Sequence, residues 1–558
     1  MDPAAEGWPG VVARPSMYLR SALLRKRRKV PQTGCTVSLT PVDGQPLGHD
    51  ILVSVMHAAG LAWLWPEVVA LMKTCKELYH EGTRLLLTET VDLRGHGSIA
   101  SFTSFILHAN SALLPHFHNR LSIWVNDTDY PVPDDVCKSF PQAISRSTHL
   151  RSLHILHLNP LLQTYPDLLT AFLSLPALED LYIRIWVEAR HMLIAKFLRG
   201  LRCPLKCLRL QCFVRDHGKN VDYRREADPL WLCAGVAATL ETLALTGLVQ
   251  MGTTHSYPNV KNFHMEVGLI PILRPIITSF PALRTLVSVP RPLPSNYAEI
   301  SCFMVDYSGK GHWAPKDENV PTWKHSREAN RRDQLVNGSW DTLDTLISNS
   351  LVACTLGLIC HVRRVHLLLQ FDSLDKRVII TLISVLRDTR PHCLRLAFYR
   401  VDIDLVLHMM EHVIYVRDYL SELELRLNIS EGSFDAKQYL NQLVHALRFS
   451  NIFSLRIELV CFKEQFARTP TECSNRCWQE FLREYCIMED TIRAADVRKV
   501  AKHFITTLPD LRYIEIWWGS CYMPYGLDGG GVGINLDVGP ETYDIPAEAH
   551  PDDWDATW

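Results

Sequence analysis

Residues 150–155 read Leu-Arg-Ser-Leu-His-Ile, residues 178–183 read Leu-Glu-Asp-Leu-Tyr-Ile, and residues 205–210 read Leu-Lys-Cys-Leu-Arg-Leu. In this L-x-x-L-x-L phrase the last two apolar residues alternate with polar ones, so a strand would turn them to one side of a sheet. The phrases start 28 residues apart (150 to 178) and then 27 residues apart (178 to 205). A nearly constant period of this length predicts a repeat architecture.

The same phrase recurs along the rest of the chain. Clear copies begin at Leu240, Val362, Leu420, Ile452 and Leu511, and weaker ones at Val260, Leu283 and Leu394. Amphipathic stretches lie between copies, at residues 168–175, 192–198, 270–277, 405–416 and 497–505. One strand plus one helix per unit predicts an α/β array similar to a leucine-rich-repeat solenoid. The later gaps are uneven, so we expect insertions to make this array irregular.

A proline phrase recurs where each of three predicted helices meets the next strand. It reads Ser-Leu-Pro-Ala-Leu at residues 174–178, Ser-Phe-Pro-Ala-Leu at 279–283 and Thr-Leu-Pro-Asp-Leu at 507–511. Proline cannot continue a helix, and it disfavours helical geometry in the residue before it. The phrase therefore predicts that these helices end just before the proline.

The composition disfavours several classes of protein. Lys and Arg number 58 and Asp and Glu number 60, so no basic field is available to bind nucleic acid. No run approaches the length of about 18 apolar residues that a membrane helix needs, so no membrane partner is expected. The 16 cysteines include no C-x-x-C pair, and no secretory signal opens the sequence. These features predict a reducing location, cytoplasmic or nuclear.

The patterns divide the chain into four parts. Residues 1–45 are expected to be a flexible basic leader, whose cations at positions 26–29 fit either a nuclear-import patch or a solvated arm. Residues 46–90 are a helical module, and residues 91–520 are the α/β array, with an insertion at about 290–339. Residues 521–558 are expected to be a disordered tail, Gly-rich and then acidic.

Two helices are expected in the module. Apolar residues near its start recur at helical spacing, and a second helix begins at Pro66, whose fixed φ suits a first turn. Gly82 then marks a break. The apolar positions that define the two helices are Leu47, Ile51, Val55, Leu71, Cys75 and Leu78.

This module resembles the F-box of fungal F-box proteins. The resemblance rests on Leu-Gly-His-Asp-Ile-Leu at residues 47–52 and Leu-Met-Lys-Thr-Cys-Lys-Glu-Leu-Tyr at residues 71–79. The family opening usually reads L-P-x-E-[IL], and here Gly48 stands in the place of the proline. Residues 340–346 and 356–365 also look like phrases of basidiomycete F-box and leucine-rich-repeat proteins.

The resemblance implies a substrate receptor of an SCF-type cullin RING ubiquitin ligase. In such a receptor the module docks the Skp adaptor through the six apolar positions named above, and the repeat face binds a substrate protein. The alternative is a leucine-rich-repeat scaffold without a ligase role, in which the same helices cap the solenoid. Two short apolar helices cannot bury their faces on themselves, so either a partner or the array must cover them.

The predicted substrate-binding face follows from strand alternation. Residues between the core leucines point away from the core, and aromatic and arginine side chains there are favoured anchors. The alternative is a set of solvated cross-strand pairs. The residues are Tyr182, Arg184, Trp186, Arg209, Gln211, Glu424, Arg426, Arg456, Glu458, Glu515 and Trp517.

One string suggests metal chemistry, but an ordinary helix is favoured. His408, Glu411 and His412 form an H-x-x-E-H pattern that could bind zinc on one helical face, with Glu480 as the candidate third ligand. The cysteine pairs 203/207 and 473/477 lack the spacing of a metal site, and the glycines at 529–533 lack the residues of a phosphate loop. The prediction is a non-enzymatic protein without metal or cofactor.

Overall fold

A computed structural model describes most of the 558-residue chain. The described residues are 49–61, 65–88, 90–108, 114–125, 134–186, 191–213, 229–246, 255–267, 272–290, 323–369, 376–398, 403–413, 418–429, 435–461, 496–520, 530–536 and 539–546. The predicted leader, with its cations at positions 26–29, lies outside them, as do Leu47 and Glu480.

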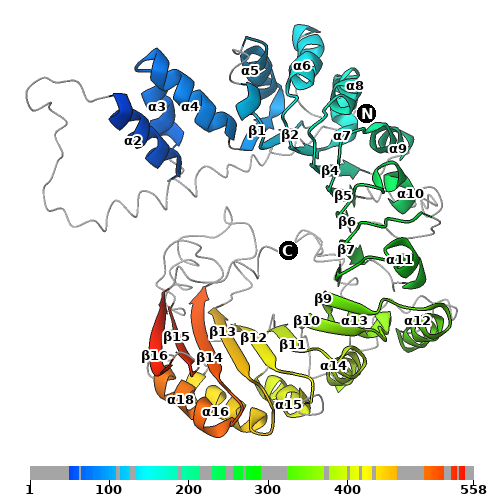
Figure 1. The fold of residues 1–558 in the computed structure, drawn as a ribbon, viewed down its shortest axis with the longest axis vertical. Helices are drawn as coiled ribbons and strands as arrows, with labels where there is room; N and C mark the ends of the chain where they lie inside the picture. Colours follow the sequence, from blue (N-terminus) through cyan, green and yellow to red (C-terminus); the bar gives the residue numbers. More distant parts are fainter. Residues whose placement is uncertain are drawn as a thin grey trace, which may run out of the picture.

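The described residues form one open sheet in which strands follow one another in chain order (Figure 1). Strands β1 to β14 are all parallel to their neighbours, and β15 and β16 add antiparallel to the last edge. The parallel strands are β1 (Thr90–Arg94), β2 (Arg120–Trp124), β3 (Ser152–Leu156), β4 (Asp180–Trp186), β5 (Cys207–Phe213), β6 (Thr242–Thr246), β7 (Asn262–Val267), β8 (Thr285–Pro290), β9 (Thr342–Asn349), β10 (His361–Leu369), β11 (Cys393–Phe398), β12 (Glu422–Ile429), β13 (Ser454–Cys461) and β14 (Tyr513–Ser520).

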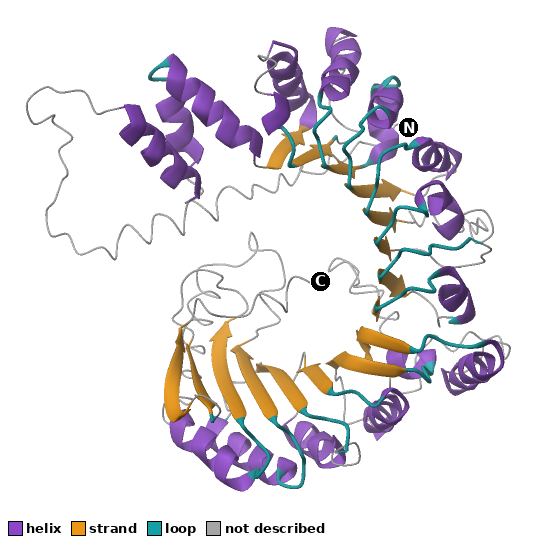
Figure 2. Ribbon diagram, in the orientation of Figure 1, coloured by secondary structure: helices purple, strands orange, loops and turns teal. Residues whose placement is uncertain are grey.

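The sheet bends into an arc with the strands on its inner side and the helices on its outer side (Figure 2). The outer layer contains α5 (Gly95–His108), α6 (Asp134–Arg146), α7 (Leu158–Thr164), α8 (Leu168–Leu173), α9 (His191–Gly200), α10 (Pro229–Cys233), α11 (Arg274–Ser279), α12 (Trp323–Asn337), α13 (Ser350–Leu356), α14 (Lys376–Thr389), α15 (Ile403–Val413), α16 (Ala436–Leu447) and α18 (Val497–Thr507). This arrangement is the predicted α/β solenoid.

One continuous apolar core fills the space between the two layers. The last two apolar residues of each repeated phrase supply it, as Leu153 and Ile155 do in β3 and Leu181 and Ile183 do in β4, all of them fully buried. The alternate residues face the inner side of the arc, because successive side chains of a strand point to opposite faces.

Every strand predicted from a repeated phrase is present, including the three weaker copies, which become β7, β8 and β11. The five predicted helices are also present, as α8, α9, α11, α15 and α18. The proline phrase acts as expected, since α8, α11 and α18 end at Leu173, Ser279 and Thr507, each two or three residues before the proline. Strands β1, β2 and β9 are not predicted, because β1 and β2 lack the leading leucine of the phrase and β9 has Ser348 in the place of its last apolar residue.

The N-terminal module contains three helices and not two. They are α2 (His49–Leu61), α3 (Trp65–Met72) and α4 (Lys76–Thr88). The predicted break at Gly82 is wrong, because α4 runs through it. A Cβ at Gly82 would lie 2.2 Å from Cγ of Met72 and 3.1 Å from Sδ of Met56, so the glycine lets the three helices pack closely.

Two expected irregular regions are partly ordered. Within the predicted insertion, residues 323–337 form α12, which packs on the array. Within the predicted disordered tail, residues 530–546 contain β15 (Gly530–Asn535) and β16 (Gly539–Pro546), a hairpin that pairs with β14. The expectation of a disordered tail is therefore wrong for these residues, whereas an ordered helix does not contradict the predicted insertion. Backbone pairing to an existing sheet edge can order a glycine-rich segment that has few side chains to bury.

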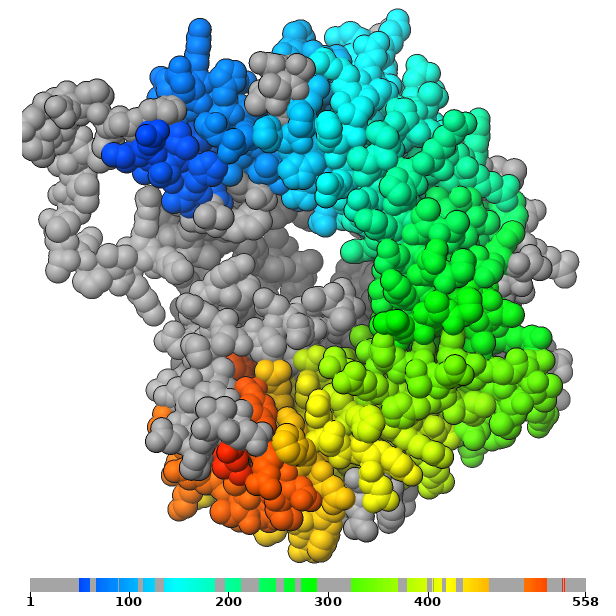
Figure 3. Space-filling model, viewed as in Figure 1, coloured from blue at the N-terminus to red at the C-terminus, as the bar shows by residue number. Residues whose placement is uncertain are grey.

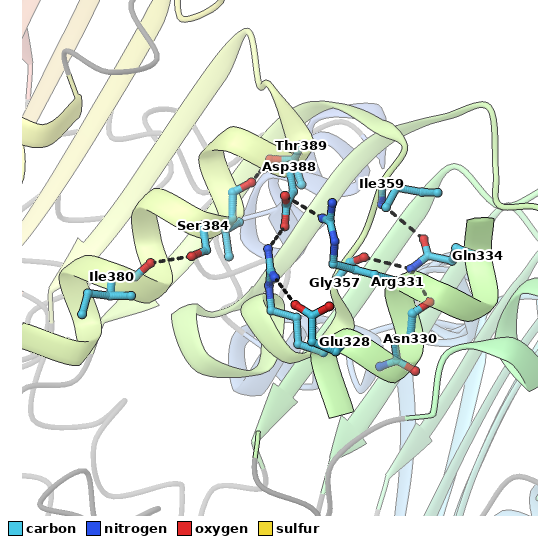
Figure 4. A network of polar contacts seen from close by, with 12 residues as sticks. Glu328, Asn330, Arg331, Gln334, Gly357, Ile359, Ile380, Ser384, Asp388 and Thr389 are labelled. Atoms are coloured by element: carbon cyan, nitrogen blue, oxygen red, sulfur yellow. Dashed lines mark hydrogen bonds and ion pairs between the residues drawn. The ribbon is translucent and has the colours of Figure 1, made fainter. Parts of the chain in front are cut away.

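Polar contacts, more than apolar ones, hold α12 in place (Figure 4). Its Asn330 accepts from the backbone N–H of Leu273 at 3.1 Å and donates to the carbonyl of Thr355 at 2.9 Å. Two arginines of the helix, Arg327 and Arg331, both contact the carboxylate of Asp388 on α14. The helix therefore links Leu273, just before α11, to Thr355 of α13 and Asp388 of α14.

Gln334 completes this network one turn further along α12. Its side chain donates to the carbonyl of Gly357 at 2.9 Å and accepts from the N–H of Ile359 at 3.2 Å. Gly357 has a φ of +56° as it ends α13, a conformation that favours glycine. These contacts involve buried amide groups, which sequence periodicity does not reveal.

Among the helices of the described residues, none combines the length and the apolar character that crossing a membrane requires.

Candidate functional site

A single row of side chains crosses the inner face of all fourteen parallel strands. Each member pairs in register with the next, without a slip from β1 to β14. Strand alternation predicted five of its members, and the structure adds the other nine. In chain order the row is Asp92, Ser122, His154, Tyr182, Arg209, Ala244, His264, Val287, Ile347, His366, Arg395, Glu424, Arg456 and Glu515.

A second row lies two residues further along each strand. It brings Arg184 beside Gln211 at one end, and Arg426, Glu458 and Trp517 together at the other. The predicted Trp186 ends β4 and pairs in register with Phe213, and its side chain is outside the described set. The eleven predicted face residues therefore fall into two groups, one on β4 and β5 and one on β12 to β14.

The charged residues of the second group, together with Arg395 of β11, form what we call the ion-paired patch: Arg395, Glu424, Arg426, Arg456, Glu458 and Glu515. Arg395 lies 2.8 Å from Glu424, and Nε of Arg456 donates to Glu515 at 2.8 Å. Arg426 lies 3.8 Å from Glu458. Opposite charges thus alternate across neighbouring strands, where side chains directly opposite each other interact most strongly.

Two glutamates of this patch are not exposed, which corrects the prediction. Glu458 is 3% exposed and Glu515 is 9% exposed. Parallel strands lie about 4.8 Å apart, so long paired side chains cover one another on the inner side of a curved sheet. Sequence alternation identifies which residues lie on the inner face, but it does not show whether ion pairs remove their side chains from solvent.

His366 precedes the ion-paired patch in the same row. Burial, together with the charges of Arg395 and Arg364, lowers the pKa of its imidazole to about 3. The ring is therefore neutral at neutral pH. A neutral imidazole here avoids adding a third positive charge between two arginines.

The first group centres on β3 to β5. The Ser152 hydroxyl donates to Asp180 at 2.9 Å, and Nε2 of His154 lies 3.7 Å from the same carboxylate. Burial raises the pKa of Asp180, but the contacts with His154, Ser152 and Cys207 and the charge of Arg209 outweigh burial and lower it to about 2. This carboxylate is therefore ionised across the physiological range.

Tyr182 lies at the middle of this group. Its hydroxyl donates to Oε1 of Gln211, and its ring lies 5.3 Å from that of His154, measured between centroids. Burial raises the pKa of the phenol, so it remains a protonated donor. Beside it, Arg209 is exposed to solvent. Here the polar groups position an aromatic ring and leave an arginine accessible.

A small apolar cluster separates the two groups. Val287 and Ile347 are buried on the inner face, and Leu368 packs against them. These three residues lie on β8, β9 and β10, in the middle of the arc. The neighbouring row stays polar here, through Asn262, Thr285, Thr345 and Arg364, but these four residues include no acid. The two groups lie on opposite sides of the apolar cluster and are described as separate surfaces.

The N-terminal module presents a different kind of surface. Met56, Ala59, Val68 and Leu78 form its own small core, separate from the core of the array. An open groove of about 560 Å³ lies beside this core and is lined by Val55, Ala58, Ala59, Glu67, Ala70 and Leu71. Almost all of the surface of this groove is apolar.

The predicted adaptor-binding positions divide into exposed and buried ones. Ile51 is 53% exposed and Val55 is 50% exposed, and Cys75 is exposed as well. Leu78 is fully buried in the module core, so its predicted contact with a partner is wrong. Leu71 is half-buried and lines the groove. Sequence reasoning missed Val69, which is 38% exposed, because helix α3 turns it outward.

The zinc string lies on α15. The imidazole of His408 lies 3.4 Å from Glu411, and the rings of His408 and His412 lie 4.7 Å apart between centroids. Within the described residues, no set of three or more His, Cys, Asp or Glu side chains could hold a metal ion. Glu480 and the cysteine pair at 473 and 477 lie outside those residues.

No family model and no curated protein matches this chain. The solved structures that it resembles include the crystal structure of the Rad7 and Elc1 complex in yeast, at 11% sequence identity. That match covers 74% of this chain and 94% of that chain, with a TM-score of 0.29. A TM-score this low supports no conclusion about fold, partner or function.

Proposed function

We propose that this chain is a protein-binding receptor of a cullin RING ubiquitin ligase. In this proposal the α2–α4 module docks a Skp-type adaptor, and the inner face of the array recruits a substrate protein. The single observation that carries the proposal is the apolar groove of the module, because Ile51 and Val55 remain half-exposed after the module has formed its own core.

An exposed apolar surface on a small helical module favours a helical partner. Aliphatic side chains in a groove between two helices are typical of sites that receive an amphipathic helix. Burying the exposed parts of Ile51, Val55 and Val69 would remove apolar area from water, at roughly 25 cal/mol per Å². The resemblance of this module to the F-box identifies the Skp adaptor as the partner to test first.

One observation supports a capping role as well. Leu87, near the end of α4, belongs to the core of the array, and α4 contacts β1. The last helix of the module therefore covers the end of the apolar core at the first strand of the array. Capping and docking use different faces, since the groove is lined by residues of α2 and α3. A scaffold without a ligase role remains the alternative if the groove receives no adaptor.

The proposal includes no catalytic step by this chain. A receptor of this kind acts by holding two proteins near each other, which raises their effective concentration without new chemistry. We also propose a cytoplasmic or nuclear location, because a ligase receptor must meet its adaptor there.

The test is co-purification of the chain with a fungal Skp adaptor. Wild type is compared with an Ile51→Asp, Val55→Asp variant, which places two charges on the exposed edge of the module. The matched control is Ile380→Asp on α14, where the isoleucine is 54% exposed and lies far along the chain. All three proteins are first checked for equal thermal stability and equal helical signal.

We expect wild type and the Ile380→Asp control to capture the adaptor. The module variant should bind the adaptor with an apparent affinity at least tenfold weaker. Equal capture by all three proteins would contradict a site on α2 and α3. Failure of folded wild type to capture the adaptor would favour the scaffold without a ligase role.

A further inference from the structure

The inner face uses its arginines differently at its two ends. On β10 to β14 the described inner-face residues include four arginines, Arg364, Arg395, Arg426 and Arg456, and four glutamates, Glu422, Glu424, Glu458 and Glu515. On β1 to β5 they include four arginines, Arg94, Arg120, Arg184 and Arg209, but only two acids, Asp92 and Asp180. The first five strands therefore carry an excess of positive charge.

Both acids of this region already have partners. Asp92 lies 2.7 Å from Arg94, on the same strand. Asp180 accepts from Ser152, lies near His154 and interacts with the charge of Arg209. The excess positive charge thus lies on β2 to β5, where the three arginines Arg120, Arg184 and Arg209 share the inner face with one acid, Asp180. We call these three arginines, together with Tyr182, the arginine patch.

The exposure of the arginine patch suits contact with another molecule. Arg209 is exposed, and Arg120, Tyr182 and Arg184 are half-buried. In the ion-paired patch, by contrast, Arg395 is only 7% exposed. The positive field of Arg209 reaches its neighbours, since burial and this charge together lower the pKa of His264 two strands away. The described residues curve around an inner space, and the strands lie on the side that faces it (Figure 2 and Figure 3).

We propose that the arginine patch binds an acidic, extended segment of a partner protein. This deepens the proposed receptor role and rests on it, because it names the chemical class of the segment that the inner face recruits. Arg120 and Arg209 are three strands apart, which corresponds to about 15 Å, or roughly four to five residues of an extended chain. Two carboxylates with that separation could each meet an arginine, while the Tyr182 ring supplies a flat apolar contact between them.

Charge and chemistry favour a protein segment over nucleic acid. Arginine pairs with carboxylates through a planar fork of donors and is enriched, with tyrosine, among the anchors of protein interfaces. Nucleic acid would require a longer basic track, and the whole chain has a net charge of −2. Oligonucleotide binding is therefore an outcome that the test must be able to reveal.

The test measures binding of a fluorescein-labelled peptide of ten glutamates by fluorescence anisotropy. The variant is Arg120→Glu, Arg209→Glu, and the matched control is Arg202→Glu, Arg332→Glu, which reverses two exposed arginines outside the strands. A second variant, Arg120→Gln, Arg209→Gln, replaces the first if charge reversal prevents folding. Labelled decalysine and a thymidine decanucleotide are measured in parallel.

We expect the wild type and the control to bind decaglutamate with affinities within twofold of each other, and the patch variant to lose at least tenfold. Decalysine should not bind. Equal affinity of the patch variant, no binding by wild type, or tighter binding of the oligonucleotide would each overturn the proposal. The Ile51→Asp, Val55→Asp variant should bind decaglutamate normally, so failure of adaptor docking and failure of this inference are distinguishable.

Discussion

The two ends of the inner face have the same strand geometry and the same abundance of arginine, but they differ in what their arginines contact. In the ion-paired patch, each arginine has a glutamate of a neighbouring strand within 4 Å, and the side chains are largely withdrawn from solvent. In the arginine patch, three arginines share the face with one acid, Asp180, and Arg209 is exposed. The difference indicates that a charged inner surface need not be a binding surface.

The physical reason lies in the cost of removing charge from water. A buried ion pair is costly to break, because the partner left behind is an uncompensated buried charge. Such a surface offers little to a ligand, since binding would have to displace existing partners. An exposed arginine loses only part of its hydration when it meets a carboxylate, so its binding energy remains available.

The largest expected effect is on Glu458. We expect Glu458→Ala to lower the free energy of unfolding by about 3 kcal/mol, because Arg426 would lose its carboxylate in a nearly closed site. Chemical denaturation at neutral pH measures this value. A change below about 1 kcal/mol would show that the ion-paired patch is not stabilising.

The next effect depends on pH and concerns Asp180. Its pKa is about 2 in the folded chain and 3.8 otherwise, so its ionised form stabilises the fold above about pH 4. That contribution, about 2 kcal/mol, is lost as the pH falls from about 4 to about 2. Asp180→Asn should therefore be less stable than wild type at pH 7, and the difference should shrink at pH 3. A difference that does not change with pH would contradict the assigned pKa.

The smallest effect is a difference between two arginine pairs of similar length. Arg456 and Glu515 lie 2.8 Å apart with little exposure, whereas Arg94 and Asp92 lie 2.7 Å apart with about half of each side chain exposed. Double-mutant cycles with alanine should give a coupling of about 1.5 kcal/mol for the first pair and about 0.3 kcal/mol for the second. Equal couplings would mean that burial does not distinguish the two regions.

The sequence predicts the solenoid well because the core residues of each repeat alternate within a few positions of one another. The residue pairs Leu153 and Ile155, Leu208 and Leu210, and Leu455 and Ile457 all occupy the core positions that alternation assigns them. The proline phrase also works locally, since proline ends a helix wherever it stands. These features need no knowledge of distant residues.

The missed features depend on contacts between distant residues. Helix α12 has few apolar side chains, and its position depends on amide and arginine contacts with residues 273, 355, 357 and 388. The hairpin of β15 and β16 depends on a free edge at β14. The low exposure of Glu458 and Glu515 depends on their ion pairs with arginines of the preceding strands, Arg426 and Arg456. A periodic pattern carries none of this information.

The candidate sites show the same division. Helical spacing placed Ile51 and Val55 correctly on an exposed face of the module, but it also assigned Leu78 to that face. Leu78 lies on a third helix, α4, whereas the sequence analysis assigns it to the helix that begins at Pro66 and places a break at Gly82. Close packing at a glycine and a helix break at a glycine look alike in a sequence.

One paired measurement tests most directly the claim that the two ends of the inner face have different roles. Arg209→Gln and Arg395→Gln remove one arginine each from the arginine patch and from the ion-paired patch, and both proteins are measured for decaglutamate affinity and unfolding free energy. We predict that Arg209→Gln weakens binding several-fold with stability within about 0.5 kcal/mol of wild type, and that Arg395→Gln lowers stability by about 2 kcal/mol without weakening binding. If both substitutions changed the same property to the same extent, the account of two distinct surfaces would be wrong.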